Sequence, residues 1–400
     1  MSRCVIVRGW AFAADGQALR AIRLRANRVT LAGVVGLPRP DVKAALPEAP
    51  DDNTGFEIRG TLPSGRVRLS IEAAFADGAW QQLISCAVSV ERQFIPLWLG
   101  GGAWTELMFF QMPAHMAYSA RPVRPEKFSA SAPGAHRPSL AIVTPSYQQA
   151  RYLEETIQGV LSQPGVDCQY VVQDGGSTDD SVPLIQRHAA RLHAWESVRD
   201  GGQADAIARG FAKTSGGPDD LMAWINSDDY YHPGTLAFVA DYFSRHPDVD
   251  VLYGHRIVVD ESSREIARWF LPQHDDAVLR LNDFVPQETM FWRRRLWDRV
   301  GGLDTSFKFA MDWDLLLRFQ AAGARIVRVP YFLACFRVHP GQKTSASMHD
   351  LGQREITLLR ERTQGRPFLT QELERSPRLL RYLRRSAFIE FLWKLGLRAP

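Results

Sequence analysis

The chain has 400 residues, a formal net charge of +4 at pH 7, 45% hydrophobic residues and 23% charged residues. This composition is typical of a globular protein and argues against disorder along the whole chain, while the length predicts two domains. The mild positive charge permits anionic ligands or lipid surfaces, and we expect no nucleic acid partner. The four cysteines form no CxxC pair, which argues against a zinc site or a disulfide framework and favours a reducing cytoplasm.

The sequence predicts neither a secretory signal nor a membrane span. MSRCVIVRGWAFAADG lacks the sustained apolar core of a signal peptide, and no later run approaches the roughly 20 apolar residues that cross a bilayer. We therefore expect a cytoplasmic protein.

Residues 1–95 are predicted to form a β-rich accessory domain. Apolar and polar residues alternate in short runs separated by Gly, Asp and Pro: VIVRGWAFA, AIRLRANRV, GFEIRGTL, GRVRLSIEAAF and WQQLISCAVSV. This pattern is typical of short strands and predicts a small β-sandwich. Trp10 and Trp80 are either platforms for sugars or, the reading we prefer, core residues. The prolines and glycines of residues 96–138 indicate a linker.

Residues 139–347 show a different pattern, in which apolar runs alternate with helical segments. The runs are SLAIVTP, RYLEETIQGVLSQ, CQYVVQD, DSVPLIQRHAARL, WESVRD, QADAIARGFAKT and LMAWINSDD. Such alternation favours right-handed βαβ units and an α/β domain with a mostly parallel sheet. Residues 348–400 are predicted to be a basic helical extension.

Polar residues follow each of the first four predicted strands of this domain, and the carboxyl ends of parallel strands form the ligand crevice of an open α/β sheet. The strand ends are residues 144–147 (TPSY), 173–174 (QD), 199–200 (RD) and 226–229 (NSDD). Ser177 and Asp179, in the loop after the second strand, are better explained as helix caps. Two adjacent carboxylates after a buried strand are costly without a cation, so Asp228 and Asp229 indicate Mg²⁺ or Mn²⁺.

Seven blocks of residues 139–347 resemble family 2 glycosyltransferases of the GT-A fold. In order, and at the family's approximate spacing, they are TPSYQQARYLEETIQGVLSQ, VVQDGGSTDDS, DGGQADAIARG, WINSDDYYHPGTL, PQETMFWRR, FAMDWDLLLRF and FRVHPGQKTS. The resemblance implies a Rossmann-like mixed sheet and inverting, metal-dependent transfer of a sugar. The implied donor is a nucleoside-diphosphate sugar, UDP-type above all, and the acceptor a glycan or lipid-linked saccharide of cell-surface polysaccharide assembly.

The resemblance also implies a set of nucleotide-binding residues. Three of them border the base in the first-strand segment: Thr144, Pro145 and Tyr147. Asp174 matches a carboxylate that hydrogen-bonds the base, although an Asp before two glycines also suits a turn. Asp205 and Arg209 match the region along the nucleotide and diphosphate, but Ala208 stands where the family often has Asn.

The metal site is implied by the DxD-type motif of the family, of which only the final pair is retained here. Asp229 matches the metal ligand and Asp228 a contact to the ribose or to the metal's shell. The cation neutralises the charge that develops on the departing diphosphate. His339 matches a histidine that completes the metal site or touches the diphosphate, and an unligated loop histidine is the alternative.

The acid–base step is implied at the start of a predicted helix. Asp312 matches the catalytic base that deprotonates the acceptor hydroxyl, although an Asp at a helix N-terminus is also a favoured cap. We expect Asp314, two positions on and on another face, to cap the helix or bind the acceptor. Gln287 and Glu288 precede an apolar strand and suit hydroxyls of the donor sugar or acceptor, with solvation of the strand end as the alternative.

Two features bear on the acceptor. The chain lacks a QxxRW motif and the transmembrane helices of processive synthases, so transfer of a single sugar is expected. Residues 375–400 interleave Arg with Leu, Phe and Trp, which predicts either an amphipathic helix on an anionic membrane or a basic helix packed on its own domain.

Two other functions compete with sugar transfer. A sugar nucleotidyltransferase should carry a glycine-rich, basic loop after the first strand, where TPSYQQARYL has no glycine. A non-catalytic glycan-binding protein should have lost carboxylates that this chain retains.

Overall fold

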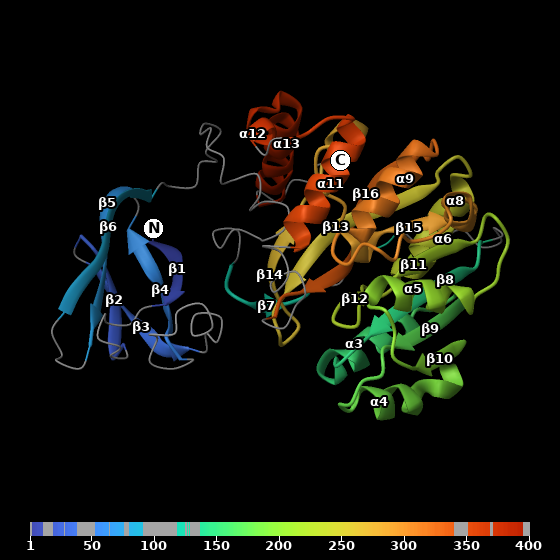
Figure 1. Cartoon of the computed structure of the whole chain (residues 1–400), viewed down its shortest axis with the longest axis horizontal. Helices are drawn as coiled ribbons and strands as arrows, with labels where there is room; N and C mark the ends of the chain where they lie inside the picture. Colours follow the sequence, from blue (N-terminus) through green and yellow to red (C-terminus); the bar gives the residue numbers. More distant parts are fainter. Residues whose placement is uncertain are drawn as a thin grey trace. The chain divides into compact units, whose positions relative to one another are not determined.

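The computed structural model describes residues 2–10, 19–27, 29–37, 53–63, 65–75, 80–90, 118–124, 126, 128, 137–339, 351–368 and 371–394. The chain divides into two compact units, shown in Figure 1. One comprises Met1–Leu99 with Pro113–Ala117, and the other comprises Gly100–Met112 with Tyr118–Pro400.

The N-terminal unit contains an antiparallel sheet with the strand order β1-β4-β3-β2-β5-β6. Its strands are β1 (Ser2–Trp10), β2 (Ala21–Ala26), β3 (Val29–Leu37), β4 (Gly55–Pro63), β5 (Gly65–Ala74) and β6 (Trp80–Val90). Alternate residues of β2 are buried, and Ile22 and Leu24 pack with Phe56 and Ile58 in a hydrophobic cluster. The predicted β-rich character of this region is therefore confirmed.

Trp80 is not a core residue. Its side chain is 40% exposed, and the guanidinium of Arg23 lies 3.8 Å from the centre of its ring. The expectation of a core tryptophan is wrong here because Trp80 begins β6, whose first four residues are all exposed. The side chain of Trp10 lies outside the described residues.

The second unit is an α/β domain around a mixed sheet, as predicted, with the order β10-β9-β8-β11-β15-β13-β14-β7 and with β16 beside β13 and β12. The strands are β7 (Arg121–Pro122), β8 (Leu140–Ser146), β9 (Cys168–Asp174), β10 (Ala194–Ser197), β11 (Leu221–Trp224), β12 (Tyr230–Tyr231), β13 (Val251–Val259), β14 (Arg264–Trp269), β15 (Phe291–Arg293) and β16 (Ile326–Arg337). Strands β10, β9, β8 and β11 are parallel, and β15, β13, β14 and β7 continue antiparallel. The short strand β7 lies within the segment expected to be a linker.

The helices of this unit follow the strands in the predicted alternation as far as β11. They are α3 (Ala150–Leu161), α4 (Ser181–His188), α5 (Gln203–Ala212), α6 (Thr235–Arg245), α7 (Asp276–Leu279), α8 (Arg294–Val300), α9 (Met311–Ala321), α11 (Gln353–Gln364), α12 (Gln371–Arg375) and α13 (Pro377–Lys394), with single turns η1 (Ala189–Arg191) and η2 (Gln287–Thr289). Every residue of β8 and β11 is buried, which explains their continuous apolar runs.

Helix α5 packs closely on β8 and β9 because Gly210 has no side chain. A Cβ atom at Gly210 would come within 2.4 Å of the side chain of Val143 on β8. Any larger residue would push the helix away from the sheet, so this glycine sets the distance between α5 and β8.

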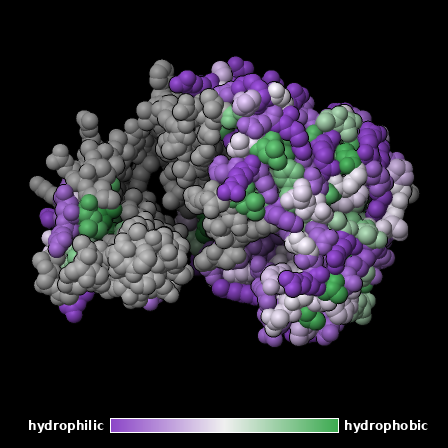
Figure 2. Space-filling model, viewed as in Figure 1, coloured by the Kyte–Doolittle hydropathy of each residue, from purple (hydrophilic) through white to green (hydrophobic). Residues whose placement is uncertain are grey.

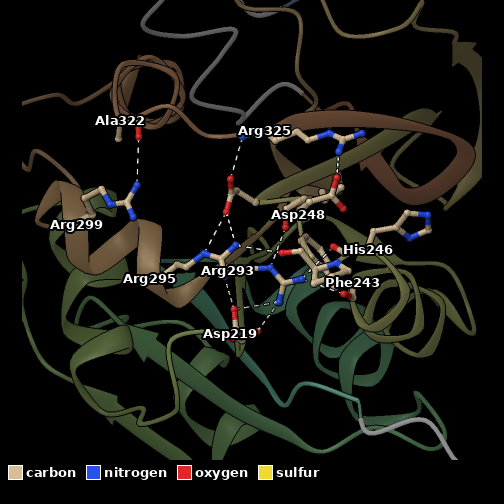
Figure 3. A network of polar contacts seen from close by, with 12 residues as sticks. Asp219, Phe243, His246, Asp248, Arg293, Arg295, Arg299, Ala322 and Arg325 are labelled. Carbon is tan, nitrogen blue, oxygen red and sulfur yellow. Dashed lines mark hydrogen bonds and ion pairs between the residues drawn. The ribbon is translucent and has the colours of Figure 1, made fainter.

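A network of arginines ties the middle of the sheet to the end of α6 (Figure 3). The buried guanidinium of Arg293 on β15 donates to the carbonyls of Phe243, His246 and Val249. These carbonyls include ones that α6 leaves without intrahelical partners at its C-terminus. Arg295 pairs with Asp250, which also accepts from the backbone of Arg325.

Helix α13 packs on its own domain through its apolar side. Leu379 and Tyr382 are buried, and Trp393 contacts the ring of Phe270 at 5.2 Å. No helix within the described ranges is long and apolar enough to cross a membrane. The face of this unit drawn in Figure 2 is largely hydrophilic, with hydrophobic residues in small separate patches.

Candidate active site

A cleft of about 850 Å³ opens at the carboxyl ends of the parallel strands and extends toward β13, β14 and the start of α9. At one end the walls come from the loops after β8, β9 and β10 and from the first turn of α5. At the other end they come from β13, β14, β16 and the segments around η2 and α9. The acidic pair that follows β11, Asp228 and Asp229, also lines the cleft.

At the end of the cleft formed by the loops after β8, β9 and β10, the ring of Tyr147 and the carboxylate of Asp200 both lie next to Gly175. Pro145 and Tyr147 line the cleft, and the side chain of Tyr147 is 63% exposed. A Cβ atom on Gly175 would lie 3.3 Å from that ring and 2.8 Å from Oδ2 of Asp200. Gly175 thus leaves room for both side chains. Asp200 lines the cleft, and its other oxygen accepts from the amide of Gly202 at 2.8 Å.

Asp174 lies deeper than Asp200, and four protein donors bind its carboxylate. Its carboxylate accepts from the amides of Gly176 and Ser177 and from the hydroxyls of Ser177 and Ser197, at 2.6 to 3.0 Å. It is fully buried and does not line the cleft. Thr144 is buried as well, with its hydroxyl 2.9 Å from that of Tyr170. Both residues hold the walls of this end in place.

Asp205 and Arg209 lie outside the cleft wall. Their side chains form an ion pair of 3.0 Å along α5, and Asp205 also accepts from the amide of Gly201. The residues of this helix that line the cleft are Gln203 and Ala206.

Arg337 on β16 binds both residues of the acidic pair, Asp228 and Asp229. The amide of Arg337 donates to Oδ1 of Asp229 at 2.9 Å, and its guanidinium donates to the backbone carbonyl of Asp228 and pairs with Glu155. Oδ2 of Asp228 lies 3.0 Å from Nε2 of His339, whose ring packs on that of Tyr152. Asp228 and Asp229 are adjacent, and His339, which the family resemblance implied for this site, contacts Asp228.

Burial and the charges of Asp228 and Glu288 raise the pKa of Asp229 well above its usual range. Asp229 is 1% exposed, so its ionised form lacks the hydration of a surface carboxylate. Two adjacent carboxylates with an imidazole on one of them fit a hard divalent cation whose remaining ligands come from substrate and water. Among the described residues no three or more His, Cys, Asp or Glu side chains come together so that they could hold a metal ion by themselves.

A chain of side-chain amides fixes one wall beside the acidic pair. Gln203 donates to Asn226 at 2.7 Å, Asn226 donates to Gln287 at 3.2 Å, and Gln287 donates to the carbonyl of Trp224 at 2.8 Å. Gln287 lines the cleft, yet its amide already has a donor and an acceptor partner. Its main effect is to orient Asn226, the first residue of the NSDD segment.

Glu288 is engaged in a bidentate ion pair. Both of its oxygens lie 2.7 Å from the guanidinium of Arg256 on β13, and the carboxylate is almost fully buried. Arg256 also lies over the rings of Trp269 and Phe336, and all four side chains line the cleft. The sequence offered no signal for Arg256 or Trp269, because they occupy antiparallel strands whose ends do not meet at one edge.

Asp312 lines the cleft in the first turn of α9, and its Oδ1 accepts from the amide of Trp313. The amides that precede the helix, those of residues 308–310, donate to Glu355 of α11 at 2.8 Å. The carboxylate of Glu355 therefore caps the backbone amides at the N-terminus of α9. Asp314 is fully buried in ion pairs with Arg318 and Arg362, so the expectation that it caps the helix or binds the acceptor is wrong.

Asp283 is a further carboxyl group of this end that the sequence did not single out. It lines the cleft and accepts from the amide of Val285 at 3.0 Å. Burial, followed by the negative charge of Asp312, raises the pKa of Asp283 well above its usual range.

Comparison with known proteins shows which families and structures this domain is similar to. Residues 141–301 match the model of the family described as Glycosyl transferase family 2. Over 218 residues the chain is 29% identical to the O-antigen biosynthesis protein RfbC of Myxococcus xanthus, a match that covers 53% of this chain and 17% of that protein. Over 195 residues it is 26% identical to a PGL/p-HBAD biosynthesis glycosyltransferase of Mycobacterium tuberculosis, covering 48% of this chain and 73% of the relative.

Similar solved structures include TarS of S. aureus in complex with UDP-GlcNAc, with a TM-score of 0.43 and 18% identity over 55% of this chain and 66% of that one. The mannosyltransferase PcManGT of Pyrobaculum calidifontis, in complex with GDP-Man and Mn²⁺, has a TM-score of 0.41 and 20% identity over 53% and 60% of the two chains.

Proposed function

We propose that the chain, whose residues 141–301 match the model of Glycosyl transferase family 2, transfers one sugar from a nucleoside-diphosphate sugar to a glycan or lipid-linked acceptor, with inversion at the anomeric carbon. The observation that carries this proposal is the presence of Asp228, Asp229 and Asp312 in the walls of one cleft. The names of the two relatives, which refer to O-antigen and glycolipid biosynthesis, support an acceptor of the cell surface.

The nucleotide binds at the end of the cleft formed by the loops after β8, β9 and β10. Tyr147 offers an exposed ring on which a base stacks, and Asp200 offers a carboxylate acceptor beside it. Asp174, Thr144, Asp205 and Arg209 act on the nucleotide only indirectly in this proposal, by holding the loops and α5. UDP is the nucleotide that we would test first.

The diphosphate lies over Asp228 and Asp229, with His339 behind Asp228. Asp228 and Asp229 would hold Mn²⁺ or Mg²⁺, which would supply positive charge against the departing diphosphate. Arg337 keeps the two carboxylates in place through its amide and guanidinium.

Asp312 is the base of the reaction. It accepts the proton of the acceptor hydroxyl as the oxygen attacks the anomeric carbon on the face opposite the diphosphate, which inverts the configuration in one displacement. Because Glu355 binds the amides before α9, the position of Asp312 is fixed without a capping role of its own.

Donor hydrolysis tests this function. We expect the purified chain with Mn²⁺ to release nucleoside diphosphate slowly from a UDP-sugar, and EDTA or Asp229→Asn to abolish that release. Asp298→Asn, which removes an exposed carboxylate that does not line the cleft, is the matched control. The proposal fails if UDP-, GDP- and dTDP-sugars all give neither metal-dependent turnover nor binding.

We also propose that α13 docks on the inner face of the membrane through its outward side. Arg381, Arg384, Arg385 and Phe388 follow one another at helical spacing and are all exposed, Phe388 by 56%. A row of arginines with an aromatic ring fits anionic lipid headgroups. The apolar side of the helix remains packed on the domain.

A further inference from the structure

One face of the N-terminal sheet carries a row of polar side chains. Ile22 and Leu24 of β2 pack in the hydrophobic cluster, and Arg23 lies between them, half-buried on the opposite face. The register places Arg23 opposite Glu72 on β5, and Glu72 opposite Gln82 on β6. These three side chains therefore form one row across three neighbouring strands.

Trp80 reaches across this face beside the row. In register it stands opposite Ala74 on β5, and the guanidinium of Arg23, two strands away, lies 3.8 Å from the centre of its ring. Glu72 holds Arg23 at the sheet, because its Oε2 accepts from Nε at 2.7 Å. Since Arg23 covers one face of the ring, the exposed 40% of Trp80 belongs to the other face and the edge. The ring is thus ordered before a ligand arrives.

The polar groups beside the ring can make further hydrogen bonds. The hydroxyl of Ser70 donates to Oε1 of Gln82 at 3.1 Å, and the amide nitrogen of Gln82 has no partner among the described residues. Oε1 of Glu72 has longer contacts, 3.5 Å to Ser70 and 3.6 Å to Arg25. An open aromatic face with donors and acceptors around it fits a sugar ring, which has apolar C–H faces and hydroxyl groups at its edge.

The described side chains of this face have an excess of positive charge. Arg23 and Arg25 share the carboxylate of Glu72, with the shorter contact to Arg23, 2.7 Å against 3.6 Å. The side chain of Arg25 is 54% exposed, whereas that of Glu72 is 13% exposed. Arg25 therefore presents a planar set of donors to solvent, and such a set binds a carboxylate by two hydrogen bonds.

We propose that this face binds an acidic glycan, with a sugar ring on Trp80 and a carboxylate of the glycan on Arg25. A bilayer would favour several apolar side chains around the ring, where this face has Glu72 and Gln82. A second copy of the face would bring the same excess of positive charge to it. The inference rests on the proposed glycosyltransferase function only in identifying the glycan as an acceptor polymer, which a weak second contact keeps near the enzyme.

Paired oligosaccharides test the proposal. The pairs are cellotetraose with its tetraglucuronate and mannotetraose with its tetramannuronate, all β-1,4-linked, so the members of a pair differ only in the carboxylates at C6. Calorimetry measures the affinity of the full chain for each. We expect at least one uronate to bind, and its neutral partner to bind more weakly by on the order of tenfold, because it lacks the charge-assisted hydrogen bonds to Arg25.

A fluorine label locates the bound oligosaccharide. In a chain made with 5-fluorotryptophan, the ¹⁹F resonance that is lost in Trp80→Phe belongs to Trp80. We expect this resonance to shift as the uronate is added, with the same midpoint as the calorimetric titration. A uronate that binds without shifting it binds elsewhere, and that result overturns the proposal.

Two variants with matched controls separate stacking from charge. Trp80→Ala should weaken binding of the uronate by about tenfold, whereas Leu358→Ala, which removes an exposed apolar side chain from α11, should not. Arg25→Gln should lower the affinity for the uronate to that of its neutral partner. Arg187→Gln should preserve the difference, because Arg187 is an exposed arginine of the other unit with a similar contact, 3.5 Å, to Glu154.

Failure of this inference can be told from failure of the proposed function. The inference is overturned if no uronate binds, if a uronate and its neutral partner bind equally, or if Trp80→Ala or Arg25→Gln leaves binding unchanged. Binding of UDP with Mn²⁺ is measured on the same preparations. Its absence overturns the glycosyltransferase function and the identification of the glycan as an acceptor, while the uronate titrations still decide whether this face binds glycans.

Discussion

Replacing Asp229 by Asn should stabilise the metal-free protein and abolish its function. Asp229 is 1% exposed, lies next to Asp228 and feels the charge of Glu288. Asn keeps the oxygen that accepts from the amide of Arg337 but removes the buried charge. Relief of that charge is worth on the order of 1–3 kcal/mol, which corresponds to a rise in Tm of roughly 2–12 °C for a domain of this size.

The sign of the pH dependence follows from the raised pKa of Asp229. The folded state holds the proton more tightly than the unfolded chain, so this carboxyl lowers the stability of the wild type as pH rises above about 4. The advantage of Asp229→Asn should therefore grow with pH until the folded-state pKa is passed, and then level off.

Binding of Mn²⁺ and UDP should make the wild type more thermally stable than Asp229→Asn, the reverse of the order without ligands. At about 100 times their dissociation constants, Mn²⁺ and UDP stabilise a binding-competent protein by about 2.7 kcal/mol, or roughly 5–10 °C. The wild type should show this rise in scanning calorimetry, and Asp229→Asn should not. A metal-free variant that melts below the wild type, or one that keeps the metal-dependent rise, would refute the assignment of Asp229.

Three further outcomes are expected. Asp312→Asn should lower the rate of sugar transfer by about 10²- to 10⁴-fold while calorimetry shows unchanged binding of UDP with Mn²⁺; near-normal transfer would exclude Asp312 as the base. His255 is buried, and this burial is the main reason that its pKa is lowered to about 3. Because the unfolded chain takes up a proton near pH 6.5 and the folded protein does not, the folded protein loses stability as the pH falls below 6.5. In urea unfolding, the free energy of unfolding of the wild type should fall by about 2 kcal/mol more than that of His255→Gln between pH 7.5 and 5. If the wild type and His255→Gln lost the same free energy of unfolding over this pH range, the effect assigned to His255 would be wrong. Replacing Arg381, Arg384 and Arg385 by Ala should weaken sedimentation with anionic vesicles by on the order of 100-fold, with neutral vesicles as the control; unchanged sedimentation would rule out docking through α13.

The sequence predicted the parallel half of the sheet and the acidic pair, because both follow from local rules. Buried parallel strands appear as continuous apolar runs, and their carboxyl ends lie at one edge. That reasoning leads directly from β11 to Asp228 and Asp229. Asp312 came from the family resemblance instead, because local rules alone suit a helix cap at that position equally well.

The same rules did not show which of two strand-end aspartates faces the cleft. Asp174 and Asp200 both follow strands, but the loop after Asp174 folds back on its carboxylate and saturates it with four donors. Gly175 and Gly176, the latter with φ of +82°, allow this turn. The conformation of such a loop depends on neighbours distant in sequence, of which the hydroxyl of Ser197 is one.

Residues of the antiparallel half were harder to find. Arg256, Trp269 and Asp283 come from β13, β14 and the segment before η2, and they meet only because the sheet reverses direction at β15. On α5 the sequence did not show which face of the helix lines the cleft. Asp205 and Arg209 pair along the exposed side, while Gln203 on the same helix reaches the cleft.

The contact between Gly210 and Val143 has a consequence for attempts to change the donor. Helix α5 carries Gln203 and Ala206, and β8 leads into Pro145 and Ser146 on the facing wall. The width of the proposed nucleotide end is therefore set in part at Gly210, a residue that does not line the cleft. Libraries that aim at a larger or smaller base should vary position 210 and its partner Val143 together, because a change in either alone alters the spacing of the walls.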